Sequence, residues 1–130
     1  MNYNSVASPD ITTRVDLEWL IETFYGRVFA DEQIGLFFSL VAHVIPQTHF
    51  PLMADFWELA LFGRNRHRAA VTEKYAELPL KHTLEPHHAK RWMALFCLTV
   101  EDLFSGPTAE AAKVRACSLA TMLQSPYSPT

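Results

Sequence analysis

Apolar residues recur at helical spacing along the first third of the chain. Thr13 and Asp16 have the spacing of a capping box, which marks the start of a helix. The apolar stripe behind them follows the i, i+3, i+4 rule and consists of Leu17, Leu20, Ile21, Phe24, Tyr25 and Val28. This pattern predicts a first long helix that runs to about Ala30.

The segment that follows, residues 31–47, is too short and too apolar for an exposed loop. We predict that it makes one short helical turn and packs inward, with Phe37 and Phe38 as its anchors.

A second long helix is predicted to open around Thr48 and to end at Gly63. Pro51 is expected in its first turn, where a proline is tolerated. From residue 64 to residue 83 the periodicity weakens, and the pattern allows one short helix over about 69–78.

Pro86 stands where the first residue of a third long helix would stand. The helix behind it is apolar nearly all round, which is typical of the centre of a core. Gly106 and Pro107 are predicted to end it and to start a last helix. That last helix carries a narrow stripe of small residues, mainly Ala112, Ala116 and Ala120.

The residue types also favour helices, because Leu and Ala number 30 against 12 for Val and Ile. We find no internal repeat and no linker. The sequence therefore predicts one all-α domain over residues 1–130, with frayed ends at 1–10 and 125–130.

Composition and charge exclude several classes of function. The chain is 49% apolar and 19% charged, with a net charge of −3, so it carries no basic footprint for nucleic acid. We interpret the basic cluster at 64–68 as a solvated loop. The four glycines are too far apart for a dinucleotide-binding or phosphate-binding loop.

Cys97 and Cys117 both stand among apolar residues, which predicts buried free thiols in a reducing compartment. The N-terminal stretch has no basic start and no apolar run, and no stretch is long enough to span a membrane. These features predict a cytoplasmic protein without a membrane partner.

Six histidines raise the question of a metal site. Glu85 and His88 form a single Glu-x-x-His motif, whereas a di-iron bundle needs two copies. No C-x-x-C or H-x-x-x-H motif supports a structural zinc ion. We interpret His87 and His88 as surface residues that point to different faces of a helix.

Three side chains with polar atoms occur on helices that are otherwise apolar, namely Tyr25, His49 and Trp92. In one interpretation Tyr25 bonds a backbone carbonyl and His49 is a half-exposed capping residue. In the other, the three side chains supply hydrogen bonds to a cavity. Spacing alone leaves both open.

Three stretches, in this order and spacing, resemble the third group of the truncated haemoglobins. They are FYGRVFADEQIGLFF at 24–38, HFPLMADFWELALFG at 49–63 and LEPHHAKRWMALF at 84–96. The resemblance spans about residues 11–124. It implies a truncated globin fold, with helices packed two over two around a haem pocket.

The same resemblance implies a role for each of the polar residues. Tyr25 corresponds to a distal tyrosine that donates to an iron-bound ligand, His49 to a distal histidine and Trp92 to a tryptophan that closes the ligand pocket. Phe38 corresponds to a phenylalanine that packs on the porphyrin, and Phe56 is counted with the cofactor-binding residues. Hydrogen-bond donors in a dry pocket would stabilise a ligand with partial negative charge.

The chain departs from the family at the position of the proximal histidine, where Tyr75 stands. Three alternatives follow. Tyr75 could ligate the iron, which would favour ferric haem. His82 could ligate it instead, or haem could have been lost. An iron held only by His49 is also left open.

The sequence therefore predicts a haem protein that binds or handles a diatomic ligand such as dioxygen or nitric oxide, and it favours a binding protein over an enzyme. One alternative is a ferric-haem peroxidase or an enzyme that detoxifies nitric oxide. Another is a haem-free globin-fold protein that binds an apolar ligand or a partner. The oligomeric state is left open.

Overall fold

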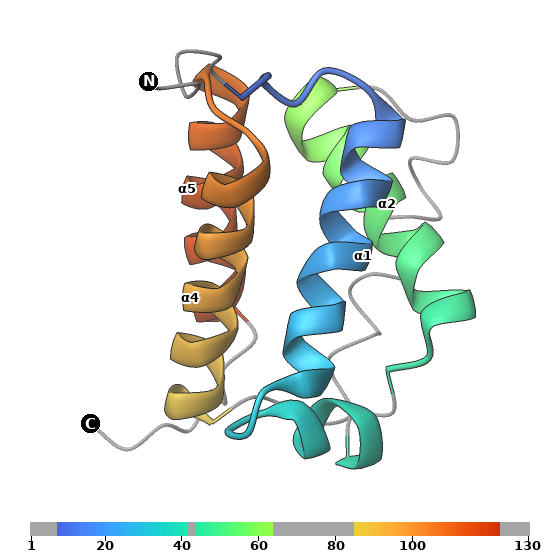
Figure 1. Cartoon of the computed structure of the whole chain (residues 1–130), viewed down its shortest axis with the longest axis vertical. Helices are drawn as coiled ribbons and strands as arrows, with labels where there is room; N and C mark the ends of the chain where they lie inside the picture. The colour runs from blue at the N-terminus through green and yellow to red at the C-terminus, as the bar shows by residue number, and fades with distance from the viewer. Residues whose placement is uncertain (1–7, 42–43, 64–84, 123–130) are drawn as a thin grey trace, which may run out of the picture.

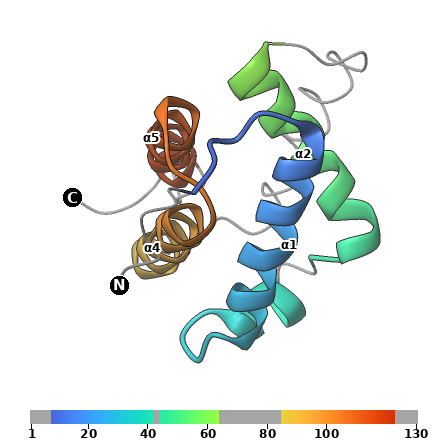
Figure 2. The same ribbon diagram turned by 45° about the horizontal axis from the view of Figure 1, so that its top comes forward.

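The fold consists of two layers of paired helices. The computed structural model describes residues 8–41, 44–63 and 85–122. Their elements are α1 (Arg14–Ala30), the π-helical turn η2 (Phe37–Val41), α2 (Pro46–Phe62), α4 (Pro86–Leu103) and α5 (Pro107–Met122). Antiparallel α1 and α2 form one layer and antiparallel α4 and α5 the other (Figures 1 and 2). The layers meet where α1 packs on α4 and α2 on α5.

The first helix has the bounds that the sequence predicts. The Thr13 side chain accepts a hydrogen bond from the Asp16 backbone N–H, and the Asp16 carboxylate accepts one from the Thr13 N–H. This reciprocal pair satisfies two of the N–H groups that a helix end leaves without partners. All six residues of the predicted apolar stripe are buried.

The turn after α1 packs inward as predicted. Asp31 accepts hydrogen bonds from the backbone N–H groups of Gln33 and Ile34 and also pairs with Arg91 of α4. Gly35 lies so close to α1 that a Cβ there would stand 2.5 Å from the Phe29 carbonyl oxygen. Only a glycine permits this approach, which brings Phe38 into the core, where it is 6% exposed.

The second helix differs from the prediction at its start. It begins at Pro46, two residues before Thr48, because the fixed φ of proline suits the first helical position. Pro51 consequently lies inside the helix and not in its first turn. The predicted end is confirmed, since Gly63 adopts φ 70° and caps the helix. The short helix predicted over 69–78 and the basic cluster at 64–68 lie outside the described residues.

Of the residues 1–10 that the sequence predicts to be frayed, the structure describes 8–10, and Pro9 and Asp10 are hydrogen-bonded near the start of α5. The Asp10 carboxylate accepts hydrogen bonds from the backbone N–H groups of Thr108 and Ala109, in the first turn of α5. The Ser105 N–H donates to the Pro9 carbonyl. Gly106, with φ 137°, leaves room for this carboxylate, because a Cβ would stand 2.5 Å from its Cγ. Asp10 is thus the cap of a helix 98 residues further along the chain.

The two thiols are free, as predicted, but they are not both buried. Cys97 is half-buried and Cys117 is exposed. The apolar neighbours of Cys117 in sequence belong to other faces of α5, whose buried stripe is Ala109, Ala112, Ala116, Leu119 and Ala120.

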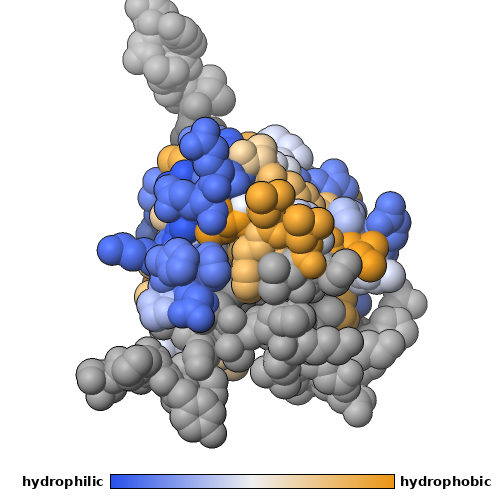
Figure 3. Space-filling model, turned by 90° about the horizontal axis from the view of Figure 1, so that it is seen from below, coloured by the Kyte–Doolittle hydropathy of each residue, from blue (hydrophilic) through white to orange (hydrophobic). Residues whose placement is uncertain are grey.

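The end of the molecule that carries η2 presents apolar side chains to solvent. Leu36 and Leu40 around η2, and Ile45 before α2, are 73%, 64% and 51% exposed. Seen from below, apolar residues gather beside a strongly hydrophilic area (Figure 3). In the described part of the chain, no helix is both long and apolar enough to cross a membrane.

The Asp10 cap gives a direct test of how the N-terminal segment holds α5. We expect Asp10→Ala to lower the free energy of unfolding by about 1–2 kcal/mol, since it removes a helix cap. Asp10→Asn keeps one acceptor oxygen and should lose less. Urea denaturation measures both variants, and an Asp10→Ala protein as stable as the wild type would contradict the capping role.

Candidate functional site

Tyr25 lies at the centre of a buried aromatic cluster. It stands on the inner face of α1, is 3% exposed, and its ring contacts Phe24, Phe29, Phe38, His49 and Phe50. The indole N–H of Trp92 donates to the Tyr25 hydroxyl oxygen across 3.4 Å. The hydroxyl partner in the described part of the chain is therefore a side chain and not a backbone carbonyl.

The direction of this hydrogen bond decides what Tyr25 can do. Because the Trp92 indole is a donor only, the tyrosine oxygen accepts and its own O–H remains able to donate to a further group. Burial raises the pKa of Tyr25 above its ordinary value, which outweighs the opposite effect of the Trp92 bond. The phenol consequently stays protonated and remains a donor.

His49 faces Tyr25 from the first turn of α2. Its ring lies edge-on to the tyrosine, with ring centroids 5.4 Å apart and an interplanar angle of 84°. The imidazole Nε2 is buried and has no hydrogen-bond partner among the described residues. Burial lowers the pKa of His49 to about 4, so the ring is neutral at pH 7. His49 is half-buried but lies inside the helix and does not cap it.

The residues brought together supply uncharged hydrogen-bonding groups in a dry setting. Tyr25, His49 and Trp92 meet, and Phe38 joins them with its ring centroid 6.4 Å from that of Tyr25. Buried donors of this kind interact more strongly than they would in water. The site can therefore orient a small polar molecule without contributing a net charge.

Phe56 of α2 has two described contacts, one with its neighbour Trp57 and one with α5. Its ring packs edge-on against Trp57 at 5.4 Å, and the Arg115 guanidinium of α5 lies 5.8 Å from its centroid.

Three stacked aromatic rings pack next to the site, and the sequence pattern did not reveal them. Trp92 is nearly parallel to Phe96, which is nearly parallel to Trp57, with centroids 5.9 and 5.1 Å apart. Trp57 is fully buried, and its Nε1 has no hydrogen-bond partner among the described residues. Since Met53 and Trp57 follow His49 at i+4 and i+8, helical spacing could have assigned all three to one face.

The sequence predicts that His87 and His88 point to different faces of a helix. In the structure, their rings instead lie close together. Their ring centroids are 4.1 Å apart, and His88 stacks on Phe37 at 4.3 Å. His88 is half-buried, and the ring of Phe37 in η2 covers one face of its imidazole. The pKa of His88 is lowered, mainly because burial desolvates the ring and also because of the charge of the neighbouring His87.

The described residues fit one side of a haem. Flat aromatic rings line the cluster, and the buried Nε2 of His49 and Nε1 of Trp57 have no hydrogen-bond partners among them. No group of three or more His, Cys, Asp or Glu side chains that could hold a free metal ion occurs among the described residues. Haem iron needs no such group, because the porphyrin and an axial side chain hold it. Tyr75 and His82, the predicted axial ligands, lie outside the described residues.

A comparison with solved structures decides the fold. The structure matches the crystal structure of a group III truncated haemoglobin from Campylobacter jejuni with a TM-score of 0.71. The match covers 95% of this chain and 99% of that chain. The chain has the truncated-haemoglobin fold. This confirms the predicted all-α truncated globin architecture.

The likeness to that truncated haemoglobin is one of fold, since the two sequences are 19% identical. No protein-family model and no curated protein sequence matches the chain. In the truncated-haemoglobin fold of this chain, α1, α2 and α4 carry Tyr25, His49 and Trp92 to one place.

The neutral state of His49 makes stability depend on pH. Because folding lowers its pKa from 6.5 to about 4, the unfolded chain takes up a proton that the folded chain refuses as the pH falls between these values. The contribution of His49 to the free energy of unfolding is therefore complete above pH 6.5 and is lost as the pH falls towards 4. It amounts to about 3 kcal/mol, at about 1.4 kcal/mol per pKa unit.

We therefore expect His49→Gln to flatten the fall in unfolding free energy between pH 6.5 and 4.5, measured by urea denaturation. His88→Gln is the matched control. This variant should still show the fall in unfolding free energy that His49 causes. Equal slopes in the wild type and the His49→Gln variant would show that this histidine is not held neutral.

Proposed function

We propose that this protein binds haem against the cluster of Tyr25, Phe38, His49 and Trp92 and uses it to bind a diatomic ligand such as dioxygen or nitric oxide. One observation carries the proposal, namely the meeting of three uncharged hydrogen-bonding side chains inside a buried aromatic cluster. An ordinary helical core would fill these positions with aliphatic residues.

The chemistry of the cluster suits haem and a small ligand. The rings of Phe38 and its neighbours offer flat apolar surface to a porphyrin. Haem, when bound, supplies an iron atom that takes a diatomic ligand. The Tyr25 O–H, which the Trp92 bond leaves able to donate, would hold a ligand of partial negative charge. The neutral His49 would stand beside it without adding a positive charge.

The axial ligand decides which chemistry the haem supports. Ligation by Tyr75 would stabilise the ferric state and favour a peroxidase-like activity. Ligation by His82 would favour the ferrous state that reversible binding of dioxygen requires. Substitution of each residue separates these two assignments.

We expect purified protein mixed with one equivalent of haemin to show a Soret band that titrates to a sharp end point. If Tyr75 ligates the iron, Tyr75→Phe removes the ferric tyrosinate charge-transfer band and His82→Ala leaves it in place. The reverse result assigns the ligand to His82.

A protein without a Soret band would contradict the proposal and would favour a haem-free globin-fold protein. A band that persists unchanged when both Tyr75 and His82 are replaced would also contradict ligation from this segment, and would leave His49 as the iron ligand to be tested by His49→Leu.

Tyr25→Phe tests the donor directly. We expect dioxygen to dissociate about two to ten times faster from the ferrous protein, because the lost hydrogen bond is worth roughly 0.5–1.5 kcal/mol. Stopped-flow displacement of dioxygen by carbon monoxide measures this rate. Phe29→Leu, which alters a neighbouring ring that carries no donor, is the control. An unchanged rate in Tyr25→Phe would show that the hydroxyl points away from the ligand.

A further inference from the structure

Both cysteines of the chain lie on the helix pair of α4 and α5, which run side by side in opposite directions (Figure 1). Lys113 of α5 pairs with Glu101 of α4 at 3.0 Å. Cys97 precedes Glu101 by four residues, and Cys117 follows Lys113 by four residues. Because the helices are antiparallel, these two steps lead the same way along the pair. Each cysteine therefore lies about one helical turn beyond the ion pair, on the same level as the other.

The two cysteines also share one side of the helix pair. Residues four apart lie on the same face of a helix, so Cys97 and Cys117 stand on the side that carries the ion pair of Glu101 and Lys113. After burial, the charges of Lys113 and Cys117 are among the influences on the pKa of the Cys97 thiol. Charges act appreciably only over short distances, so this effect places the two thiols close together.

Small residues bring the backbones of α4 and α5 close to each other. The buried stripe of α5 consists largely of alanine, namely Ala109, Ala112, Ala116 and Ala120. Packed helices have axes about 8–10 Å apart, and small side chains at the contact favour the lower end of this range. At such a separation, facing residues at the edge of the contact come within the roughly 4.4–6.8 Å between Cα atoms that a disulfide requires.

The two thiols differ in their access to solvent. Cys117 is exposed, whereas Cys97 is half-buried. Burial raises the pKa of the Cys97 thiol, which therefore stays protonated at neutral pH. Cys117 is consequently the thiol that a soluble oxidant reaches first, and Cys97 stands beside it as the second partner.

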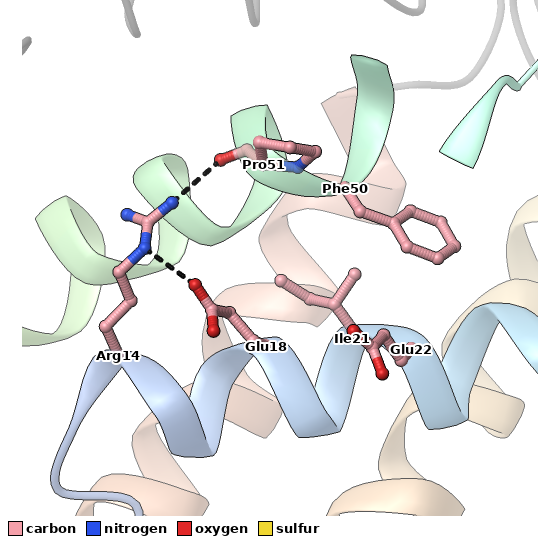
Figure 4. A pocket seen from close by; sticks show the side chains of 6 residues that line it. All are labelled: Arg14, Glu18, Ile21, Glu22, Phe50 and Pro51. Atoms are coloured by element: carbon pink, nitrogen blue, oxygen red, sulfur yellow. Dashed lines mark hydrogen bonds and ion pairs between the residues drawn. The ribbon is translucent and has the colours of Figure 1, made fainter. Parts of the chain in front are cut away.

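The other layer of the fold is joined by links of a different kind. Arg14 of α1 donates to the Glu58 carboxylate of α2 at 3.0 Å and reaches the Pro51 carbonyl at 3.4 Å; Figure 4 shows the contact with Pro51. Neither α1 nor α2 contains a cysteine. A bond between Cys97 and Cys117 would therefore tighten one layer and leave the links of the other unchanged.

We propose that Cys97 and Cys117 form a reversible disulfide that clamps α4 to α5 when the protein meets a small soluble disulfide such as oxidised glutathione. The Cys117 sulfur attacks one sulfur of the oxidant, whose S–S bond breaks, and a first reduced thiol leaves with the proton of Cys117. The Cys97 sulfur then attacks the Cys117 sulfur, and a second reduced thiol leaves with the proton of Cys97. The protein loses two electrons and the oxidant gains them. The reaction needs no haem.

Mass spectrometry tests the bond on the full chain as purified. We expect incubation with oxidised glutathione to remove two hydrogen atoms from the protein and to leave it monomeric on a non-reducing gel. Trypsin should then release peptide 92–113 joined to peptide 116–130, because it cleaves after Arg91, Lys113 and Arg115. Dithiothreitol should separate the two peptides. Protein with glutathione on both cysteines, or a dimer joined through Cys117, would overturn the proposal.

Two variants test the placement of the thiols. In Cys97→Ser the reaction should stop with glutathione on Cys117. The double variant Cys117→Ser with Ser118→Cys moves the exposed thiol by one residue, which is about 100° around α5. This variant should also stop with bound glutathione, because its thiol faces away from Cys97. Formation of the disulfide in the double variant at the wild-type rate would overturn the placement.

Amide hydrogen exchange tests the clamp. We expect oxidation to slow the exchange of residues 97–117 several-fold and to leave α1 and α2 unchanged, and we expect it to raise the melting temperature by several degrees. The same treatment of Cys97→Ser should change neither quantity. A disulfide that forms without slowing exchange between its two ends would overturn the clamp. These outcomes do not depend on whether haem binds.

Discussion

The site depends on the packing of Trp92, a residue of α4, against α1. Phe24 lies edge-on to Trp92 and to Phe96, with centroids 5.4 and 5.1 Å away. Edge-to-face contacts of this kind fix ring orientation as well as distance. They aim the Trp92 indole N–H at Tyr25, and that bond in turn leaves the tyrosine hydroxyl free to donate. If this packing were loosened, the hydrogen-bonding groups of the site would lose their common orientation.

Ion pairs and caps at the periphery hold the helices at the angles that this packing needs. Asp31 joins the end of α1 to Arg91 of α4, and Arg27 of α1 pairs with Asp102 at 2.9 Å. Arg14 joins α1 to α2, and Asp10 joins the N-terminal segment to α5. The pair of Arg27 and Asp102 is exposed and contributes little stability. The Asp31 carboxylate, by contrast, is only 7% exposed. Burial of the apolar core, aromatic and aliphatic together, is the main source of stability.

The sequence predicted those features that depend on neighbouring residues. The capping box at Thr13, the αL cap at Gly63 and the start of α4 at Pro86 are local, and all three are confirmed. Tyr25 and Trp92 were found because a polar atom on an apolar helix face needs a partner.

The features that were missed depend on residues far apart in the chain. Asp10 caps a helix 98 residues away, which no local pattern reveals. The stacking of His88 on Phe37 likewise requires the approach of two distant segments, which Gly35 permits. The position of Pro51 was predicted wrongly because α2 has two prolines near its start. The helix begins at the earlier one, Pro46, and Pro51 lies inside it. The exposure of Cys117 follows from the face of α5 that packs inward.

The central claim is that haem binds against Tyr25, His49 and Trp92, and paramagnetic NMR tests it most directly. One equivalent of haemin should broaden the indole N–H signal of Trp92 beyond detection, because ferric iron would lie close to it. The methyl signals of Ile11, beside the Asp10 cap, should remain sharp. A Trp92 signal that survives full binding of haemin would contradict the account.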